Sequence, residues 1–196
     1  MDKTHEKYAK KPRTDLRKKE YQVADEALIK KILTQGSHGT MASTYNHQPY
    51  ITPLIYLYDE EEHSLYFHGA RTGRLRANLH FNPKIAFNVL EFGNILAHKE
   101  ASEFNVAYNS VTIFGTARLI DDEKKAIKIL RHLLKKYAPH LEMGEDYKAI
   151  QANEIKITAV YEIKIQDWTC KQQIETSEYL ESFVYTPTKI SNTNKQ

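Results

Sequence analysis

Residues 39–68 have the sequence GTMASTYNHQPYITPLIYLYDEEEHSLYFH, which gives the strongest indication of the fold. Three segments in it are rich in Tyr, Ile, Leu or Thr, and they cover 39–45, 50–58 and 64–68. A polar turn containing a proline separates the first two, and an acidic turn separates the last two. Short apolar segments divided by turn residues are typical of antiparallel strands that follow one another directly. This part of the chain is therefore predicted to form a β-meander.

Beyond the meander, alternation of apolar residues predicts three more strands, at 84–90, 110–120 and 155–165. Apolar spacing of three and four residues predicts helices at 23–33, 71–81 and 121–137, the last of them capped by Asp121-Asp122. Residues 91–107 show no clear period and are expected to form a long connection. Six strands without alternating helices favour a mainly-β (α+β) fold, an antiparallel barrel with peripheral helices.

Length and composition limit the class of protein. A chain of 196 residues and 22.8 kDa is long enough for one core without disulfides, and Cys170 is its single cysteine. The first twenty residues hold eight basic and four acidic side chains, whereas the whole chain has a net charge of +3. We expect a polar basic arm at 1–20, one domain at 21–185 and a polar tail at 186–196. With no apolar run long enough to span a membrane, the chain is expected to be cytoplasmic.

The segment 68–76, with the sequence HGARTGRLR, has the richest chemistry. A strand is predicted to end here and a helix to begin, with Thr72 as a candidate cap. Arg71, Arg74 and Arg76 fall within six residues. Guanidinium groups and the free N–H groups of a helix start both suit phosphate oxygens. The segment is thus a candidate phosphate site, and a solvated basic turn is the alternative.

Several motifs, taken in order, give the chain a resemblance to a known family. They are Tyr50-Ile51-Thr52-Pro53-Leu54, Leu65-Tyr66-Phe67-His68-Gly69-Ala70, Gly73-Arg74, Asn82-Pro83, Tyr108-Asn109-Ser110-Val111 and Phe114-Gly115-Thr116-Ala117. Over about residues 20–171 the sequence resembles the nitroimidazole-resistance type of the pyridoxamine phosphate oxidase-like, FMN-binding split barrels. The resemblance implies a six-stranded split β-barrel and a homodimer with FMN between the subunits.

The resemblance also implies which residues bind FMN. Counting back from Asn82-Pro83 places Arg74 at the phosphate-binding arginine, while Gly73 and Leu75 replace the serine and lysine of the oxidase, and Arg71 is expected to supply the missing charge. The full set implied for the cofactor is Tyr50, Ile51, Thr52, Pro53, Leu54, His68, Gly69, Ala70, Arg71, Thr72, Gly73, Arg74, Ser110 and Val111. The strand 50–54 is expected to lie against the flavin ring.

By the same resemblance the chain is an FMN-dependent oxidoreductase that passes electrons or hydride to a small acceptor. His68 is the candidate catalytic residue, as a proton donor on the substrate side, with a structural role as its alternative. The oxidase binds its vitamin substrate with an arginine near the C-terminus, and this chain has no arginine after Arg131. Oxidation of pyridoxamine phosphate is therefore not assigned.

Other functions stay open at this point. Some barrels of this group bind haem through a histidine, so a haem-binding or haem-degrading protein is one alternative, and a non-catalytic flavin sensor is another. The nine histidines lack the paired spacing of metal ligands, and no metal is expected. The basic arm could bind nucleic acid, but most tyrosines lie on predicted strands, where aromatic residues belong to a core or an interface. The lysine-rich face of 121–137 is expected to be solvated.

Overall fold

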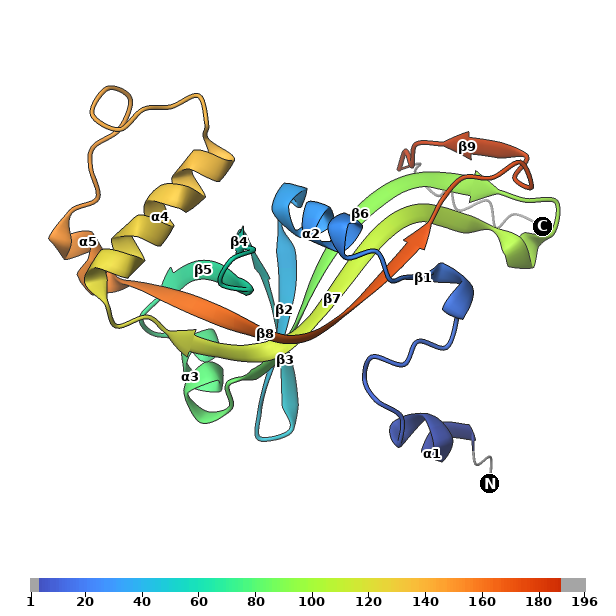
Figure 1. Cartoon of the computed structure of the whole chain (residues 1–196), viewed down its shortest axis with the longest axis horizontal. Helices are drawn as coiled ribbons and strands as arrows, with labels where there is room; N and C mark the ends of the chain where they lie inside the picture. Colours follow the sequence, from blue (N-terminus) through green and yellow to red (C-terminus); the bar gives the residue numbers. More distant parts are fainter. Residues whose placement is uncertain (1–3, 188–196) are drawn as a thin grey trace, which may run out of the picture.

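The structure, a computed structural model, describes residues 4–187, and it consists mainly of one antiparallel sheet (Figure 1). The strands are β1 (Gln22–Val23), β2 (Gly39–Tyr45), β3 (Gln48–Leu54), β4 (Leu57–Asp59), β5 (Ser64–Ala70), β6 (Lys84–Ala97), β7 (Asn105–Leu119), β8 (Thr158–Gln173) and β9 (Glu181–Phe183). Seven of them follow the order β3-β2-β6-β7-β8-β5-β4, with β1 added beside β8 and β9 beside β6. The mainly-β split barrel with peripheral helices is thus confirmed, with nine described strands instead of six. The single strand predicted at 50–58 is wrong: β3, paired with β2, ends at Leu54, and β4, paired with β5, begins at Leu57, because the backbone N–H and C=O of Tyr56 between them bond to the Tyr137 hydroxyl.

The helices lie around this sheet. They are α1 (Thr4–Ala9), α2 (Glu26–Gln35), α3 (Arg74–Phe81), α4 (Glu123–Tyr137) and α5 (Ala152–Ile157), together with the short 3-10 turns η1 (Lys19–Tyr21) and η2 (Ala101–Glu103). Asp25 caps α2 and Asp122 caps α4, because each carboxylate accepts bonds from two N–H groups of the first turn. In Figure 1, α4 and α5 lie at one end of the long strands, and β9 lies at the other.

The core forms inside the barrel, where the inward-facing residues of the long strands meet α2. Phe87, Val111 and Ile113 are almost fully buried, and Ile32 and Leu33 of α2 pack against the same cluster. A second, smaller cluster joins Ala126, Ile129 and Leu133 of α4 to Tyr66 and Val160 on the outer side of the sheet. Helix α4 therefore covers the outer surface of β5 and β8.

The connection predicted at 91–107 is wrong, because β6 runs on to Ala97 and β7 begins at Asn105. A register shift between Phe92 and Ile95 interrupts the alternation that would have revealed a strand. Gly93 lies in this bulge, where a Cβ would come within 2.9 Å of the carbonyl oxygen of Ala107. A bulge of this kind breaks the period of two without ending the pairing.

The strand predicted at 155–165 begins later, at Thr158, because residues 152–157 form α5. Glu154 accepts a bond of 2.6 Å from the N–H of Gln151, which stabilises the first turn of this helix. The N-terminal arm also has structure: α1 is helical, and the guanidinium of Arg13 donates to Asp167 at 2.6 and 3.2 Å while it lies over the ring of Phe114. Most of the predicted tail lies outside the described residues.

Candidate functional site

The strand expected to meet the flavin ring, β3, lies at the end of the described sheet order. It pairs with β2 along its whole length and has no strand on its other side among the described residues. Tyr50 and Ile51 keep 42% and 65% of their surface exposed, and Pro53 is exposed as well. The Thr52 hydroxyl is buried without a hydrogen-bond partner. An edge strand of this kind offers free backbone groups and one unsatisfied hydroxyl to a ligand.

The candidate phosphate turn follows β5. Gly73 is the N-cap of α3 and has a φ of 108°, a left-handed conformation that favours glycine. No side chain caps this helix, so the prediction that Thr72 caps it is wrong. A Cβ at Gly69 or Gly73 would meet no atom within 4 Å, so space is open on both sides of the turn. The first N–H groups of α3 are consequently available to an anion.

The three arginines of the turn differ in what they contact. Arg74 is exposed at the first helical position of α3. The guanidinium of Arg71 donates to the carbonyl oxygen of Ile155 at 2.9 and 3.2 Å, which ties the turn to α5. Arg76 and Arg71 also act on Tyr161: burial raises the pKa of this tyrosine, and the two positive charges partly oppose the increase. The Tyr161 hydroxyl itself is buried without a hydrogen-bond partner. Arg74 is therefore the cation most accessible to a phosphate.

Helix α3 connects this turn to the hairpin of β2 and β3. Asn78 Nδ2 donates to the hydroxyl of Ser43 at 3.0 Å, and each residue is only 1% exposed. Since Ser43 belongs to β2, the anchor holds α3 against the immediate neighbour of β3. Sequence reasoning missed both residues, because a single Asn and a single Ser carry no recognisable pattern. Their contact places the arginine turn and the edge strand in one region.

Ser110 and Val111, also expected near the cofactor, lie in the middle of β7. Val111 is fully buried in the core, so any ligand contact would involve its backbone. The hydroxyl of Ser110 accepts a bond of 2.9 Å from Asn88 Nδ2, on the outer surface of the sheet. Asn88 also lines a cavity of about 540 Å³ beside the end of α2. The structure thus does not bring these two residues into contact with the arginine turn within a single chain.

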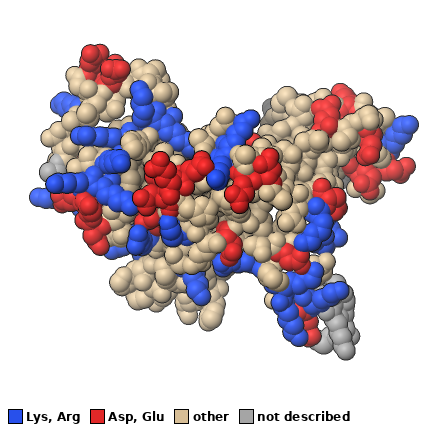
Figure 2. Space-filling view, in the orientation of Figure 1, with Lys and Arg blue, Asp and Glu red and all other residues tan. Residues whose placement is uncertain are grey.

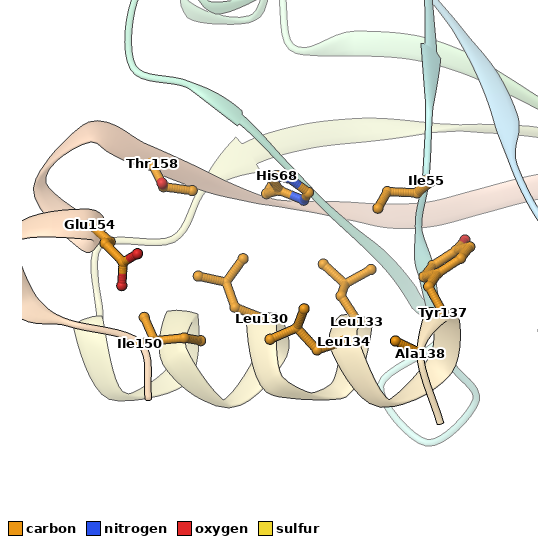
Figure 3. Close-up of a pocket in the computed structure, with 10 residues that line it drawn as sticks. All are labelled: Ile55, His68, Leu130, Leu133, Leu134, Tyr137, Ala138, Ile150, Glu154 and Thr158. Atoms are coloured by element: carbon orange, nitrogen blue, oxygen red, sulfur yellow. The ribbon is translucent and has the colours of Figure 1, made fainter. Parts of the chain in front are cut away.

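His68 lies in a different place, at a partly open cavity of about 260 Å³ between α4 and the outer surface of β5 (Figure 3). Most of the wall is apolar, and it is formed by Ile55, Leu130, Leu133, Leu134, Tyr137, Ala138 and Ile150, with Glu154 and Thr158 at one end. Although His68 keeps an exposed edge, burial of its ring lowers its pKa. At neutral pH the imidazole is therefore mostly uncharged, with one nitrogen able to donate and the other to accept.

The C-terminal end of α4 is fixed over this cavity. The Tyr137 hydroxyl accepts from the N–H of Tyr56 and donates to its carbonyl oxygen, both at 3.0 Å. Lys136 Nζ donates to the same carbonyl at 3.1 Å and lies 4.1 Å from the centre of the Tyr56 ring. Desolvation lowers the pKa of Lys136 to about 8. These contacts join α4 to the junction of β3 and β4.

Two kinds of feature are absent from residues 4–187. None of the helices described there is long and apolar enough to cross a membrane. Within the same range, no group of three or more His, Cys, Asp or Glu side chains is arranged to bind a metal ion.

An antiparallel split barrel with an arginine turn between its fifth strand and a short helix defines a class of protein. The chain belongs to the pyridoxamine 5′-phosphate oxidase family, whose model matches residues 25–172. No curated protein sequence matches the chain.

Solved structures share this fold over most of their length. The flavocytochrome Anf3 from Azotobacter vinelandii is 22% identical, with a TM-score of 0.74, and the match covers 94% of this chain and 91% of that one. An FAD and haem binding protein from Mycobacterium smegmatis is 17% identical, with a TM-score of 0.70 and coverages of 90% and 93%. A candidate 5-nitroimidazole antibiotic resistance protein from Bacteroides thetaiotaomicron is 18% identical, with a TM-score of 0.64 and coverages of 76% and 85%.

Proposed function

We propose that this protein is a flavin-binding oxidoreductase that holds FMN between β3 and the turn preceding α3. The observation that carries the proposal is the position of Arg74 at the uncapped start of α3, a helix anchored through Asn78 to β2, whose neighbour β3 is an accessible edge strand with an unsatisfied hydroxyl at Thr52. A flavin mononucleotide needs an anion site, an apolar surface and a few polar contacts at the ring edge. The residues present fit each of these needs.

In this proposal Arg74 and the first N–H groups of α3 bind the phosphate, and Arg71 adds a second positive charge. The hydrogen bond from Arg71 to the carbonyl oxygen of Ile155 keeps the guanidinium beside the turn, so Arg71 adds positive charge but is not the primary phosphate ligand. Gly69, Ala70, Thr72 and Gly73 form the open turn around the phosphate. Tyr50, Ile51, Pro53 and Leu54 offer backbone groups and apolar surface to the ring, and Thr52 offers its hydroxyl.

We also propose a homodimer with the flavin at the subunit interface. Ile51, Leu90 and Phe92 are large apolar residues on β3 and β6, with 65%, 48% and 59% of their surface exposed. Several such residues on two neighbouring parts of one sheet are unusual for a surface that faces only water. A second copy would cover them, and Ser110 on the same outer surface would then face the partner and its cofactor.

When bound, the flavin would supply the transfer of electrons or hydride. The chain would contribute the cavity and the proton-handling group, because His68 is the one ionisable side chain in the middle of the apolar wall. An engineered cavity of about 150 Å³ binds benzene, so a cavity of about 260 Å³ suits a small substituted aromatic acceptor. A nitroaromatic or a quinone has this size, and its oxygen atoms would accept a hydrogen bond from the imidazole.

The test compares FMN affinity in Arg74→Ala and in the control Arg17→Ala, which removes an exposed arginine of the arm. A charge-assisted contact is worth about 1.5–3 kcal/mol, so affinity should fall about tenfold to a hundredfold in Arg74→Ala alone. His68→Ala should retain FMN and lose turnover with the acceptor. Unchanged FMN affinity in Arg74→Ala would reject the phosphate site, and FMN that is bound but never reoxidised by acceptors would make the protein a sensor.

A second candidate function is haem binding in the cavity under α4. His68 is a suitable axial ligand within an apolar wall, and two of the similar structures are described as a flavocytochrome and as an FAD and haem binding protein. The chemistry of the lining fits, but about 260 Å³ holds only part of a macrocycle, so residues 138–151 would have to move outward. A Soret band that disappears in His68→Ala would support this function, and a purely flavin spectrum would exclude it.

A further inference from the structure

The outer surface of α4 carries a line of basic side chains. Lys124, Lys128, Arg131 and Lys135 are all exposed, and their spacing of four, three and four residues places them on one face of the helix. We call these four residues the α4 basic stripe. With a rise of about 1.5 Å per residue, the stripe is about 16 Å long. Figure 2 shows Lys and Arg atoms gathered on the lobe that α4 forms in Figure 1.

The charges of the stripe are not neutralised within residues 4–187. None of the ion pairs found among those residues involves any of the four. Glu123 is the only acidic residue of α4, which contains six Lys and Arg residues. Like charges four residues apart, as at Lys124 and Lys128, destabilise a helix. The stripe is therefore a concentrated positive surface that opposes the stability of its own helix.

The stripe lies directly behind the cavity of His68. The opposite face of α4 contributes Leu130, Leu133 and Tyr137 to the cavity wall. A helix is about 10 Å across, so only the thickness of α4 separates the stripe from whatever the cavity holds. Ile55 of this cavity directly follows β3, and His68 lies on β5 just before the arginine turn, so an electron carrier docked on the stripe would approach the side of the proposed flavin site that borders the cavity, without entering the cavity.

The surroundings of the stripe favour a protein over a lipid surface or a nucleic acid. The apolar face of α4 is buried against Tyr66 and Val160, so the helix has no free face to insert into a membrane. Asp121, Asp122 and Glu123 stand at its first turn, and Glu142 and Asp146 stand in the loop that follows it. Acidic groups at both ends would repel a long phosphate backbone but would leave room for a compact acidic patch of a protein.

We propose that the α4 basic stripe is the docking surface for an acidic electron-carrier protein, and this inference rests on the proposed redox function. In each encounter the carrier would lose one electron and be oxidised, and the cofactor bound by this chain would gain that electron and be reduced. Solvent would supply the protons that a fully reduced flavin requires. Weak complexes of this kind are small and depend on charge complementarity more than on area.

The test measures binding first, independently of any cofactor. The probe is an acidic flavodoxin carrying a fluorescent label, titrated with the full chain at several salt concentrations. The variant is Lys128→Glu/Arg131→Glu, and the control is Lys7→Glu/Lys10→Glu, which makes the same change of charge on the N-terminal arm. We expect affinity to fall with salt and to drop about tenfold or more in the stripe variant at low salt, with the control within about twofold.

A second readout follows the reduction of the cofactor-loaded protein by the reduced flavodoxin in stopped flow. The stripe variant should be slower at low salt, while dithionite should reduce wild type and variant equally. Equal flavodoxin affinity in wild type and stripe variant would overturn the inference, as would tighter binding to anionic vesicles or to single-stranded DNA than to the carrier. If purified protein holds no redox cofactor, the proposed function fails instead, and the binding result still decides whether the stripe docks the carrier.

Discussion

The buried hydroxyl of Thr52 allows a test in which one substitution has opposite effects on two properties. Thr52 Oγ1 has no hydrogen-bond partner in the cofactor-free chain, whereas the proposed flavin ring would provide one. Replacing Thr52 with Val keeps the shape of the side chain and exchanges the hydroxyl for a methyl group. The variant should therefore be more stable than wild type without FMN and should bind FMN more weakly.

Both magnitudes depend on whether the Thr52 hydroxyl has a hydrogen-bond partner. An unsatisfied buried hydroxyl costs about 1–3 kcal/mol in protein mutational data, so removing it should stabilise the cofactor-free protein by about 1 kcal/mol. For a chain of this length, that corresponds to a rise of about 2–4 °C in Tm. Loss of a neutral hydrogen bond to the flavin, worth about 0.5–1.5 kcal/mol, should weaken FMN binding about twofold to tenfold.

The assay combines thermal unfolding of cofactor-free protein with a fluorescence titration of FMN. The control is Thr44→Val, on β2 of the same hairpin, which should leave FMN affinity unchanged. A Thr52→Val variant that is stabilised but binds FMN as tightly as wild type would refute the contact between this hydroxyl and the ring. A destabilised variant would show that the hydroxyl is already satisfied without the cofactor.

The remaining predictions concern stability. Burial opposes ionisation of Glu162, but hydrogen bonds from Arg118 and Ser64 outweigh this effect and lower the pKa of Glu162 below the usual 4.5. The ionised carboxylate should therefore contribute fully to the free energy of unfolding above pH 4.5. This contribution should be lost as the pH falls through the lowered pKa. Arg118 is largely exposed, so solvent screens its charge. Arg118→Ala should therefore lower the free energy of unfolding at pH 7 by about 1–2 kcal/mol, measured by urea unfolding. In a Glu162→Gln background, most of this loss should disappear. Tyr137→Phe removes the acceptor of the Tyr56 N–H, so it should lower the free energy of unfolding by about 1 kcal/mol and increase hydrogen exchange at the end of α4. Unchanged exchange would argue against a fixed helix end.

Sequence patterns were sufficient wherever one local rule determined the structure. The two hairpins of this region, β2–β3 and β4–β5, follow from their turns, although the division of the predicted strand 50–58 between them did not show in the sequence, and α4 follows from Asp122 and the apolar positions on one face. Sequence patterns were insufficient where two local rules competed. The bulge at Gly93 interrupted an otherwise regular strand, and the alternation of residues 155–157 belongs to helix α5, which begins at Ala152 after its N-cap Gln151.

For the candidate site, the turn after β5 and the edge strand were both predicted from sequence, but their support was not. The bond between Asn78 and Ser43 joins residues that are 35 positions apart, and only the folded chain brings them together. In the same way, the cavity of His68 depends on α4, which follows it by more than fifty residues. Contacts between distant segments leave no periodic signal in a sequence.

The proposed flavin site is tested by identifying what the freshly purified protein carries. The protein would be denatured, and the released small molecules would be measured by absorbance and mass spectrometry against the protein concentration. We expect FMN, close to one molecule per chain. A protein that releases no flavin, and that fails to bind FMN when it is added, would contradict this expectation.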